Sequence, residues 1–173
     1  DRVFSLKGFG TIVTGTLIEG KISIDDEMTI YPSEKKVKVR NLQVHGCDVK
    51  TAYAGQRTAI NLSNIKVSEI QRGDVIAETG SVEESMMIDV NISLVEHCKK
   101  SLKHWDRIRV FHGTKQILCR IVPLNEDEIP YGESGYAQLR LEEKIVAKKG
   151  DRFIIRSYSP MDTIGGGVII DTA

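Results

Sequence analysis

Hydrophobic and polar residues alternate along this chain in short runs that turn residues separate. The most regular run covers residues 88–94, where apolar side chains occupy every second position, and residues 36–40 alternate valine with basic residues. A period of two is typical of strands that bury one face. Such runs recur at regular spacing, and no amphipathic helix of useful length interrupts them. The pattern therefore predicts an all-β fold built from antiparallel barrels.

The first predicted element is a hairpin over residues 1–15. Two runs rich in aromatic and β-branched residues flank Gly8-Phe9-Gly10. Glycine suits such a tight turn because it adopts a positive φ without steric cost. Further along, the apolar register slips by one position after Arg40, to Leu42 and Val44, which predicts a β-bulge near Arg40-Asn41.

Two sets of predicted strands lie on either side of a short polar segment, residues 79–85. The boundary is placed there, which gives two tandem antiparallel β-barrels over residues 1–80 and 85–173. In the second set, His112-Gly113-Thr114 is predicted to turn a hairpin. Trp105 follows Cys98 and Leu102 at helical spacing, and we interpret it as a core residue rather than a platform for stacked bases. Gly165-Gly166-Gly167 lies within a strand pattern, and we interpret it as a turn or bulge that needs close backbone approach rather than as a phosphate-binding loop.

Composition narrows the class of protein. The chain has 173 residues, of which 40% are hydrophobic, and no apolar run approaches the ~20 residues of a membrane helix. It starts without an initiator Met or a signal peptide, so we expect a piece of a longer cytoplasmic protein. The three cysteines, Cys47, Cys98 and Cys119, are an odd number without a C-x-x-C pair. This spacing favours reduced, structural thiols over disulfides or a zinc site.

Charge is balanced overall but unevenly distributed. The formal net charge is zero, so bulk attraction to nucleic acid is not expected. Between residues 99 and 120, however, seven basic residues accompany one acid, and residues 126–133 contain four acids and no base. The basic segment fits either a solvated face or a local site for phosphates.

Several motifs carry a family resemblance. The run F-S-L-K-G-F-G-T-I-V-T-G (4–15) resembles the first hairpin of domain 2 in translational GTPases of the elongation factor Tu type. Four segments of the second half resemble domain 3 of the bacterial selenocysteine-specific elongation factors: K-H-W-D-R-I-R-V-F-H-G-T (103–114), A-Q-L-R-L-E-E (137–143), G-D-R-F-I-I-R-S-Y-S-P (150–160) and T-I-G-G-G (163–167). The resemblance extends over almost the whole chain.

This resemblance implies a function. Members of the family deliver selenocysteinyl-tRNA to the ribosome in a GTP-dependent way. A GTPase domain that binds GTP and Mg precedes their two barrels, and winged-helix domains that bind an mRNA hairpin follow. No G-x-x-x-x-G-K-[ST] loop occurs here. We therefore expect no cofactor, no metal, no membrane contact and no enzymatic activity in this fragment, whereas the complete protein would be a GTPase.

The resemblance also implies a site. The family's pocket for the selenocysteinyl group matches Asp1, Arg2 and Arg57 of this sequence. Two arginines would surround a selenolate anion, because a guanidinium keeps its charge and offers several donors, and Asp1 would hold one of them in place. The family's domain 3 touches the tRNA backbone. Candidate contacts lie in the basic segment, at Lys99, Lys100, Lys103, Arg107, Arg109 and Lys115, which could instead face the GTPase domain.

Three other functions remain open at this stage. The chain could be the barrel pair of a translational GTPase that carries ordinary aminoacyl-tRNA. It could also be a β-barrel protein-interaction module without a role in nucleic-acid binding. An enzyme has little support, because His45, His97, His104 and His112 lack metal-ligand spacing and no nucleophile is paired with a base.

Overall fold

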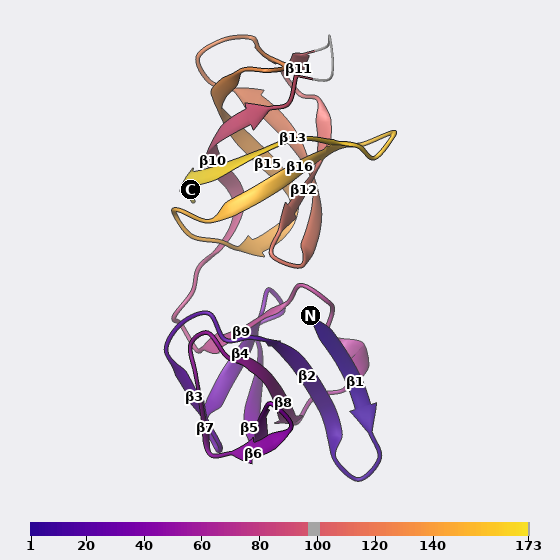
Figure 1. Cartoon of the computed structure of the whole chain (residues 1–173), viewed down its shortest axis with the longest axis vertical. Helices are drawn as coiled ribbons and strands as arrows, with labels where there is room; N and C mark the ends of the chain where they lie inside the picture. Colours follow the sequence, from indigo (N-terminus) through magenta and orange to yellow (C-terminus); the bar gives the residue numbers. More distant parts are fainter. Residues whose placement is uncertain (97–100, 173) are drawn as a thin grey trace. The chain divides into compact units, whose positions relative to one another are not determined.

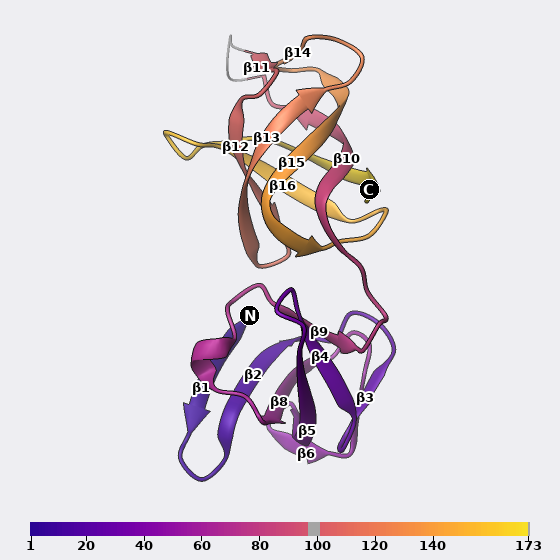
Figure 2. The ribbon, with the colours of Figure 1, turned by 180° about the vertical axis from the view of Figure 1, so that it is seen from behind.

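The computed structural model describes residues 1–96 and 101–172 and consists almost entirely of β-strands (Figures 1 and 2). The chain forms two compact units, Asp1–Val82 and Glu83–Ala173. Each unit is an antiparallel β-structure around its own hydrophobic core, which confirms the predicted fold class. Within the described residues, no helix is long and apolar enough to cross a membrane.

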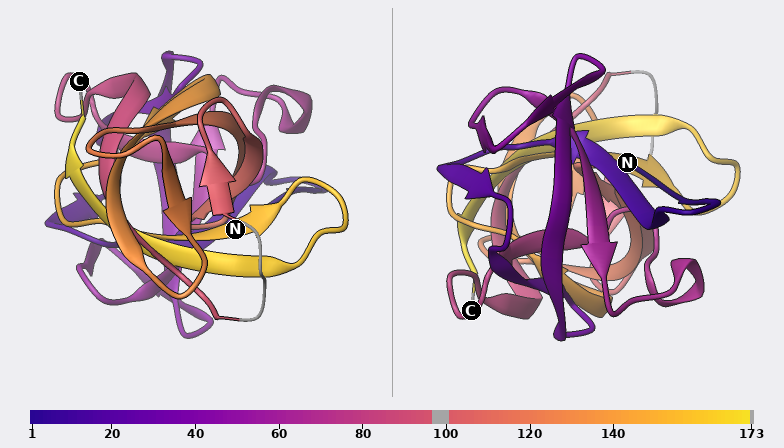
Figure 3. Two further views of the ribbon diagram at one scale, coloured as in Figure 1. Left: turned by 90° about the horizontal axis from the view of Figure 1, so that it is seen from above. Right: turned by 90° about the horizontal axis from the view of Figure 1, so that it is seen from below.

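Six strands of the first unit form a sheet in the order β1-β2-β8-β5-β4-β9, and β6 pairs with β5. Their bounds are β1 Arg2–Leu6, β2 Gly10–Thr16, β4 Glu27–Tyr31, β5 Lys35–Val44, β6 Cys47–Val49, β8 Arg57–Ser63 and β9 Val75–Glu78. Two further strands, β3 Lys21–Ser23 and β7 Thr51–Tyr53, pair with each other, and a single 3-10 turn, η1, covers Val67–Glu69. The sheet curls around one core (Figure 3).

The predicted hairpin and bulge of the first unit are confirmed. Strands β1 and β2 pair from Arg2 opposite Thr14 to Leu6 opposite Gly10. Gly8 and Gly10 have φ values of 87° and 92°, a region that strains other residues. The register between β5 and β8 shifts between Val39 and Asn41, as the slip in apolar positions predicts.

The second unit is a closed barrel of six strands in the order β10-β15-β13-β12-β16-β17. Their bounds are β10 Glu84–Leu94, β12 Arg107–His112, β13 Lys115–Pro123, β15 Ser134–Val146, β16 Arg152–Ser157 and β17 Thr163–Asp171. A separate two-stranded ladder joins β11 Ser101–Lys103 to β14 Glu128–Pro130. The apolar face of β10 enters the core as the alternation predicts, with Val90 and Ile92 fully buried.

Close backbone approach explains the triple glycine in β17. Gly165 lies opposite Leu94 and Gly167 opposite Ile92, both on β10. A Cβ atom at Gly165 would collide with the carbonyl oxygen of Ser93, and one at Gly167 with that of Asn91. The three glycines are paired strand residues of the barrel wall rather than a turn or bulge, so that part of the prediction is wrong, whereas the expected close backbone approach is confirmed.

The interpretation of Trp105 as a core residue is wrong. Residues 101–103 form a strand instead of a helical turn, and only Leu102 of that strand is buried. Trp105 then lies in the turn before β12 with a φ of 71°, and 48% of its surface is exposed. Cys98, Lys99 and Lys100 lie outside the described residues.

Candidate functional site

Pairing within the first sheet brings Asp1 close to Arg57. Strand β2 lies between β1 and β8, and Thr16 at its end is directly opposite Arg57. The Nη1 atom of Arg57 donates hydrogen bonds to Oδ2 of Asp1 and, at 3.0 Å, to Oγ1 of Thr16. Asp1 and Arg57, which are 56 positions apart in sequence, thus form an ion pair, as the resemblance leads us to expect.

The ion pair remains open to solvent. The side chain of Arg57 is 57% exposed and that of Asp1 is 32% exposed. Within the described residues, both hydrogen bonds of Arg57 leave from Nη1, so Nε and Nη2 can still donate. An exposed pair contributes little to stability, about 0–1 kcal/mol, because water and salt screen it. The arrangement therefore presents a fixed, partly neutralised guanidinium to an anion.

Arg2 lies on the same outer face of the sheet as Arg57, but its side chain contacts Phe4 instead of Arg57. It lies opposite Thr14 on β2, on the side of the sheet that carries Thr16 and Arg57, because directly paired residues point to the same face. Its guanidinium is 5.4 Å from the centroid of the Phe4 ring. Among the described residues, the structure therefore brings Asp1 and Arg57 together and leaves Arg2 stacked on Phe4.

Arg72 adds a further positive charge near Asp1, and the motifs gave no signal for it. The backbone nitrogen of Asp1 donates to the carbonyl oxygen of Thr14 at 2.7 Å. Arg57 and Arg72 both lie close enough to Asp1 to act on it electrostatically. The surroundings of Asp1 are thus electropositive, which favours an anionic ligand.

A buried amide on the same outer face also lacks a partner. Phe4, Ile12, Asn61 and Asn41 are successive cross-strand neighbours on β1, β2, β8 and β5. Asn61 is only 7% exposed, yet its Oδ1 has no hydrogen-bond partner among the described residues. Leaving such an atom unpaired costs about 1–3 kcal/mol. The sequence marks Asn61 only as a polar position in a strand, so pattern reasoning missed it.

The second barrel gathers arginines on its outer face. Arg107, Arg120 and Arg140 lie directly opposite one another on β12, β13 and β15, and we call these three residues the arginine row. Arg109 and Arg156 are opposite each other on β12 and β16, one step further along the same face. The inward neighbours, Ile108 and Val110, are buried in the core.

The predicted nucleic-acid residues of this unit have different surroundings. Arg107 and Arg109 both lie on the outer face that carries the arginine row. Their guanidinium carbons lie 4.9 Å and 5.0 Å from the centroid of the Tyr158 ring. Lys103 is exposed at the end of β11. Lys115 is 4.0 Å from a carboxylate oxygen of Glu143, and its side chain is only 11% exposed. Arg120, Arg140 and Arg156 join this face, although the predicted set did not include them.

Glu142 is the counter-ion of the arginine row. Its two carboxylate oxygens accept hydrogen bonds from Nε and Nη2 of Arg107 at 2.8 Å and 2.7 Å. These hydrogen bonds hold the pKa of Glu142 below its ordinary value, and the positive charges of Arg107 and Arg120 lower it further. In return, they raise the pKa of Arg107. Glu142 is therefore ionised at neutral pH.

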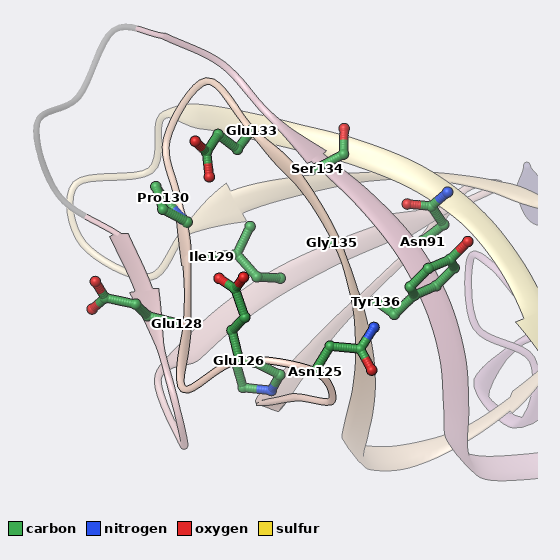
Figure 4. A pocket seen from close by; sticks show the side chains of 11 residues that line it. Asn91, Asn125, Glu126, Glu128, Ile129, Pro130, Glu133, Ser134, Gly135 and Tyr136 are labelled. Carbon is green, nitrogen blue, oxygen red and sulfur yellow. The ribbon is translucent and has the colours of Figure 1, made fainter.

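An acidic hollow of about 360 Å³ lies at one end of the second barrel (Figure 4). Glu126, Glu128 and Glu133 surround it, with Ile129 and Tyr136 as apolar lining. Ser101 donates a hydrogen bond to Glu128 at 2.8 Å. The carboxylates disfavour a nucleic-acid backbone, and within residues 1–96 and 101–172 no group of His, Cys, Asp and Glu side chains is arranged to hold a metal ion.

Comparisons with known proteins agree with this architecture. Residues 10–77 match the profile of elongation factor Tu domain 2, and residues 89–173 match that of the β-barrel domain of selenocysteine-specific elongation factors. The selenocysteine-specific elongation factor of Desulfomicrobium baculatum is 40% identical over 99% of this chain, and that of Methanocaldococcus jannaschii is 30% identical over 99%. The chain spans 27% and 40% of the lengths of these two relatives.

Solved structures show the same likeness. The apo form of translation elongation factor SelB from Methanococcus maripaludis matches all of this chain with a TM-score of 0.83 and 26% identity, over 42% of its own length. A bacterial selenocysteine-specific elongation factor matches with a TM-score of 0.84 and 26% identity, over 27% of its own length. Over nearly its whole length, the chain therefore matches selenocysteine-specific elongation factors, in the parts that correspond to elongation factor Tu domain 2 and to their β-barrel domain.

Proposed function

We propose that this chain is the tRNA-binding part of a factor that delivers selenocysteinyl-tRNA to the ribosome. The observation that carries the proposal is the ion pair of Asp1 and Arg57 on the outer face of the first barrel, at the position where the family resemblance places the selenocysteinyl group. GTP and Mg would bind in a preceding GTPase domain, and an mRNA hairpin in following winged-helix domains. Those partners belong to the complete protein.

The chemistry of the pair suits a selenolate. A selenol is more acidic than a thiol or a hydroxyl, so the selenocysteine side chain is largely anionic at neutral pH. Arg57 keeps its charge, and its Nε and Nη2 remain free to donate within the described residues. Asp1 holds the guanidinium in place but does not occupy all of its hydrogen-bond donors. Seryl-tRNA would offer only a neutral hydroxyl, which satisfies a guanidinium less well.

Arg2 completes the proposed socket after one side-chain movement. Its backbone position on the shared face is two strands from β8, a lateral separation of about 10 Å. Arginine side chains are long enough for two guanidinium groups to converge on one anion across that separation. Arg2 would leave the Phe4 ring, a contact worth about 0.5–1 kcal/mol at an exposed site, and gain a charge-assisted hydrogen bond.

Asn61 would serve the nucleotide that carries the amino acid. Its unpaired Oδ1 lies on the same face as Arg57, with Ile12 as its apolar neighbour on β2. Oδ1 is buried in the free chain, so the amide would have to rotate outward before it could hydrogen-bond the edge of a base, with the aliphatic neighbour covering the base plane. This contact is independent of the amino acid, so it would contribute equally to selenocysteinyl- and seryl-tRNA.

The proposal is tested by competition binding of selenocysteinyl- and seryl-tRNA to the full-length, GTP-bound factor. Arg57→Ala should reduce the preference for selenocysteinyl-tRNA at least tenfold, which corresponds to about 1.4 kcal/mol. Losing one partner of a buried charge pair costs about 2–5 kcal/mol, and the exposure of Arg57 places the expected effect at the lower end.

Two further variants separate the roles of the residues. Asn61→Leu should weaken the binding of both tRNAs by the same factor and leave the ratio of the two affinities unchanged. Arg40→Ala removes an equal charge from an exposed position of β5 and serves as the matched control. Unchanged discrimination by Arg57→Ala would remove Arg57 from the selenocysteine site.

A further inference from the structure

The arginine row is electrostatically unfavourable on its own. Like charges directly opposite each other on neighbouring strands destabilise a sheet. Here Arg107, Arg120 and Arg140 are opposite one another on three strands, and Arg109 and Arg156 repeat the arrangement beside them. The face therefore has a strong requirement for negative charge.

The chain meets that requirement only in part. Within the described residues, Arg107 is the one member of this face that forms an ion pair with a carboxylate. Arg120 donates to the carbonyl oxygen of Trp105 at 3.1 Å, and Arg140 to Oε1 of Gln138 at 2.9 Å. Neutral acceptors orient these two guanidinium groups, and Glu142 acts on Arg120 only through space, since in the part of the chain that the structure describes it has no hydrogen bond or ion pair with either Arg120 or Arg140.

Glu142 presents to Arg107 the geometry that a phosphate would present. Two oxygens of one anion accept two parallel hydrogen bonds from one edge of a guanidinium, which is how arginine binds either carboxylate or phosphate. Glu142 follows Arg140 by two positions on β15, on the same face. A hollow of about 390 Å³ lies beside this ion pair and is lined by Arg109, Gln116, Leu118, Glu142 and Glu143.

We propose that Glu142 is an internal counter-ion that occupies the place of an RNA phosphate on the arginine row and is displaced when RNA binds. This inference rests on the proposed function, because it assigns the anionic partner of the second barrel to the tRNA backbone. Glu142 thereby sets the affinity of the face: it protects the arginines from repelling one another in the free protein and lowers non-specific RNA binding.

An exposed aromatic favours RNA over an acidic protein as the displacing partner. Trp105, whose carbonyl oxygen accepts from Arg120, is 48% exposed at the edge of the arginine row. Aromatic side chains beside phosphate-binding arginines are typical of surfaces that contact RNA. An acidic peptide offers carboxylates to the same arginines and is the alternative that the experiment must separate.

The test measures binding of a 12-base-pair RNA duplex to the 173-residue chain by fluorescence anisotropy at 50 and 200 mM salt. Glu142→Gln keeps the side-chain shape and removes the charge, so it should tighten duplex binding about threefold to tenfold at 50 mM salt. Arg120→Gln should weaken binding at least threefold. Glu126→Gln, which removes one charge from the acidic hollow, is the matched control and should change affinity less than twofold.

Each opposite result overturns the inference. If Glu142→Gln binds no more tightly than Glu126→Gln, or more weakly than wild type, Glu142 merely positions Arg107. Absence of duplex binding by the wild-type chain at 50 mM salt excludes phosphate as the ligand. Equal competition by poly-glutamate and by RNA identifies an acidic protein instead. The duplex has no aminoacyl end, so Arg57→Ala should not affect it, and failure here is distinguishable from failure of the selenocysteine site.

Discussion

At the scale of single residues, two of the cysteines differ in burial and therefore in reactivity. Cys119 is fully buried in the second barrel, and burial raises the pKa of its thiol to about 12, with a smaller contribution from the negative charge of Glu142. Cys47 is exposed in the first unit. Only the thiolate is nucleophilic, so the raised pKa and the burial of Cys119 both suppress its reactivity.

We therefore expect iodoacetamide at pH 8 to alkylate Cys47 in the folded chain and to leave Cys119 unmodified for hours. Peptide mass spectrometry reports the two sites separately. Denaturation in guanidinium chloride should make both cysteines react at similar rates, which serves as the control. Alkylation of Cys119 at the rate of Cys47 under native conditions would show that the barrel opens frequently or that this thiol is accessible.

Side-chain direction limits what can be predicted for single residues. The β-alternation correctly places Val37 and Val39 in the core. It cannot place the end of a long side chain, and Arg2 stacks on Phe4 because a local aromatic competes with a distant partner. Trp105 was misassigned because its helical spacing has no meaning beside a strand, where only alternate residues are buried.

At the scale of elements, β17 depends on the absence of side chains. A Cβ at Gly167 would collide with the Asn91 carbonyl oxygen and would press on the Phe153 ring. Backbone on one side and a core aromatic on the other leave little room for the barrel to adjust. We expect Gly167→Ala to lower the free energy of unfolding by about 1–3 kcal/mol or more, the usual cost of overpacking.

Gly15→Ala is the matched control for this prediction. Gly15 also lies within a strand, β2, but a Cβ there would have its nearest contact at an ordinary 3.7 Å, from the amino nitrogen of Asp1. Alanine should be neutral or slightly stabilising there, because it restricts the unfolded chain. Urea denaturation followed by circular dichroism measures both variants. Equal stability of the two would show that β10 and β17 separate easily.

The positions of the strands were easier to predict than the pairing between them. The alternation over residues 88–94 identifies β10, and the glycine turn identifies the β12–β13 hairpin, because both signals are local. The arginine row also needs β15 beside β13, a pairing between strands separated by β14 in the chain. Sequence periodicity carries no information about that register, so Arg120 and Arg140 were not among the predicted nucleic-acid residues.

At the scale of the whole molecule, the two compact units have separate cores. The core cluster of the first unit runs from Val13 to Ile70, and that of the second from Ile88 to Ile169. In the described residues of the second unit, the six-stranded sheet closes into a barrel and so has no unpaired edge, whereas the β11–β14 ladder remains separate from it. A closed barrel with its own core satisfies the physical requirements of an independently folding domain.

We therefore expect residues 83–173 to fold alone and to unfold in one cooperative transition. The control is a chain of residues 93–173, which removes nearly all of β10. Strand β10 bridges β15 and β17, so without it the barrel has two open edges and loses Ile88, Val90 and Ile92 from its core. Thermal unfolding by calorimetry should show a single transition for 83–173 and none for 93–173. An aggregated or molten 83–173 would mean that residues before Glu83 complete this core, and the two units would then be one folding domain.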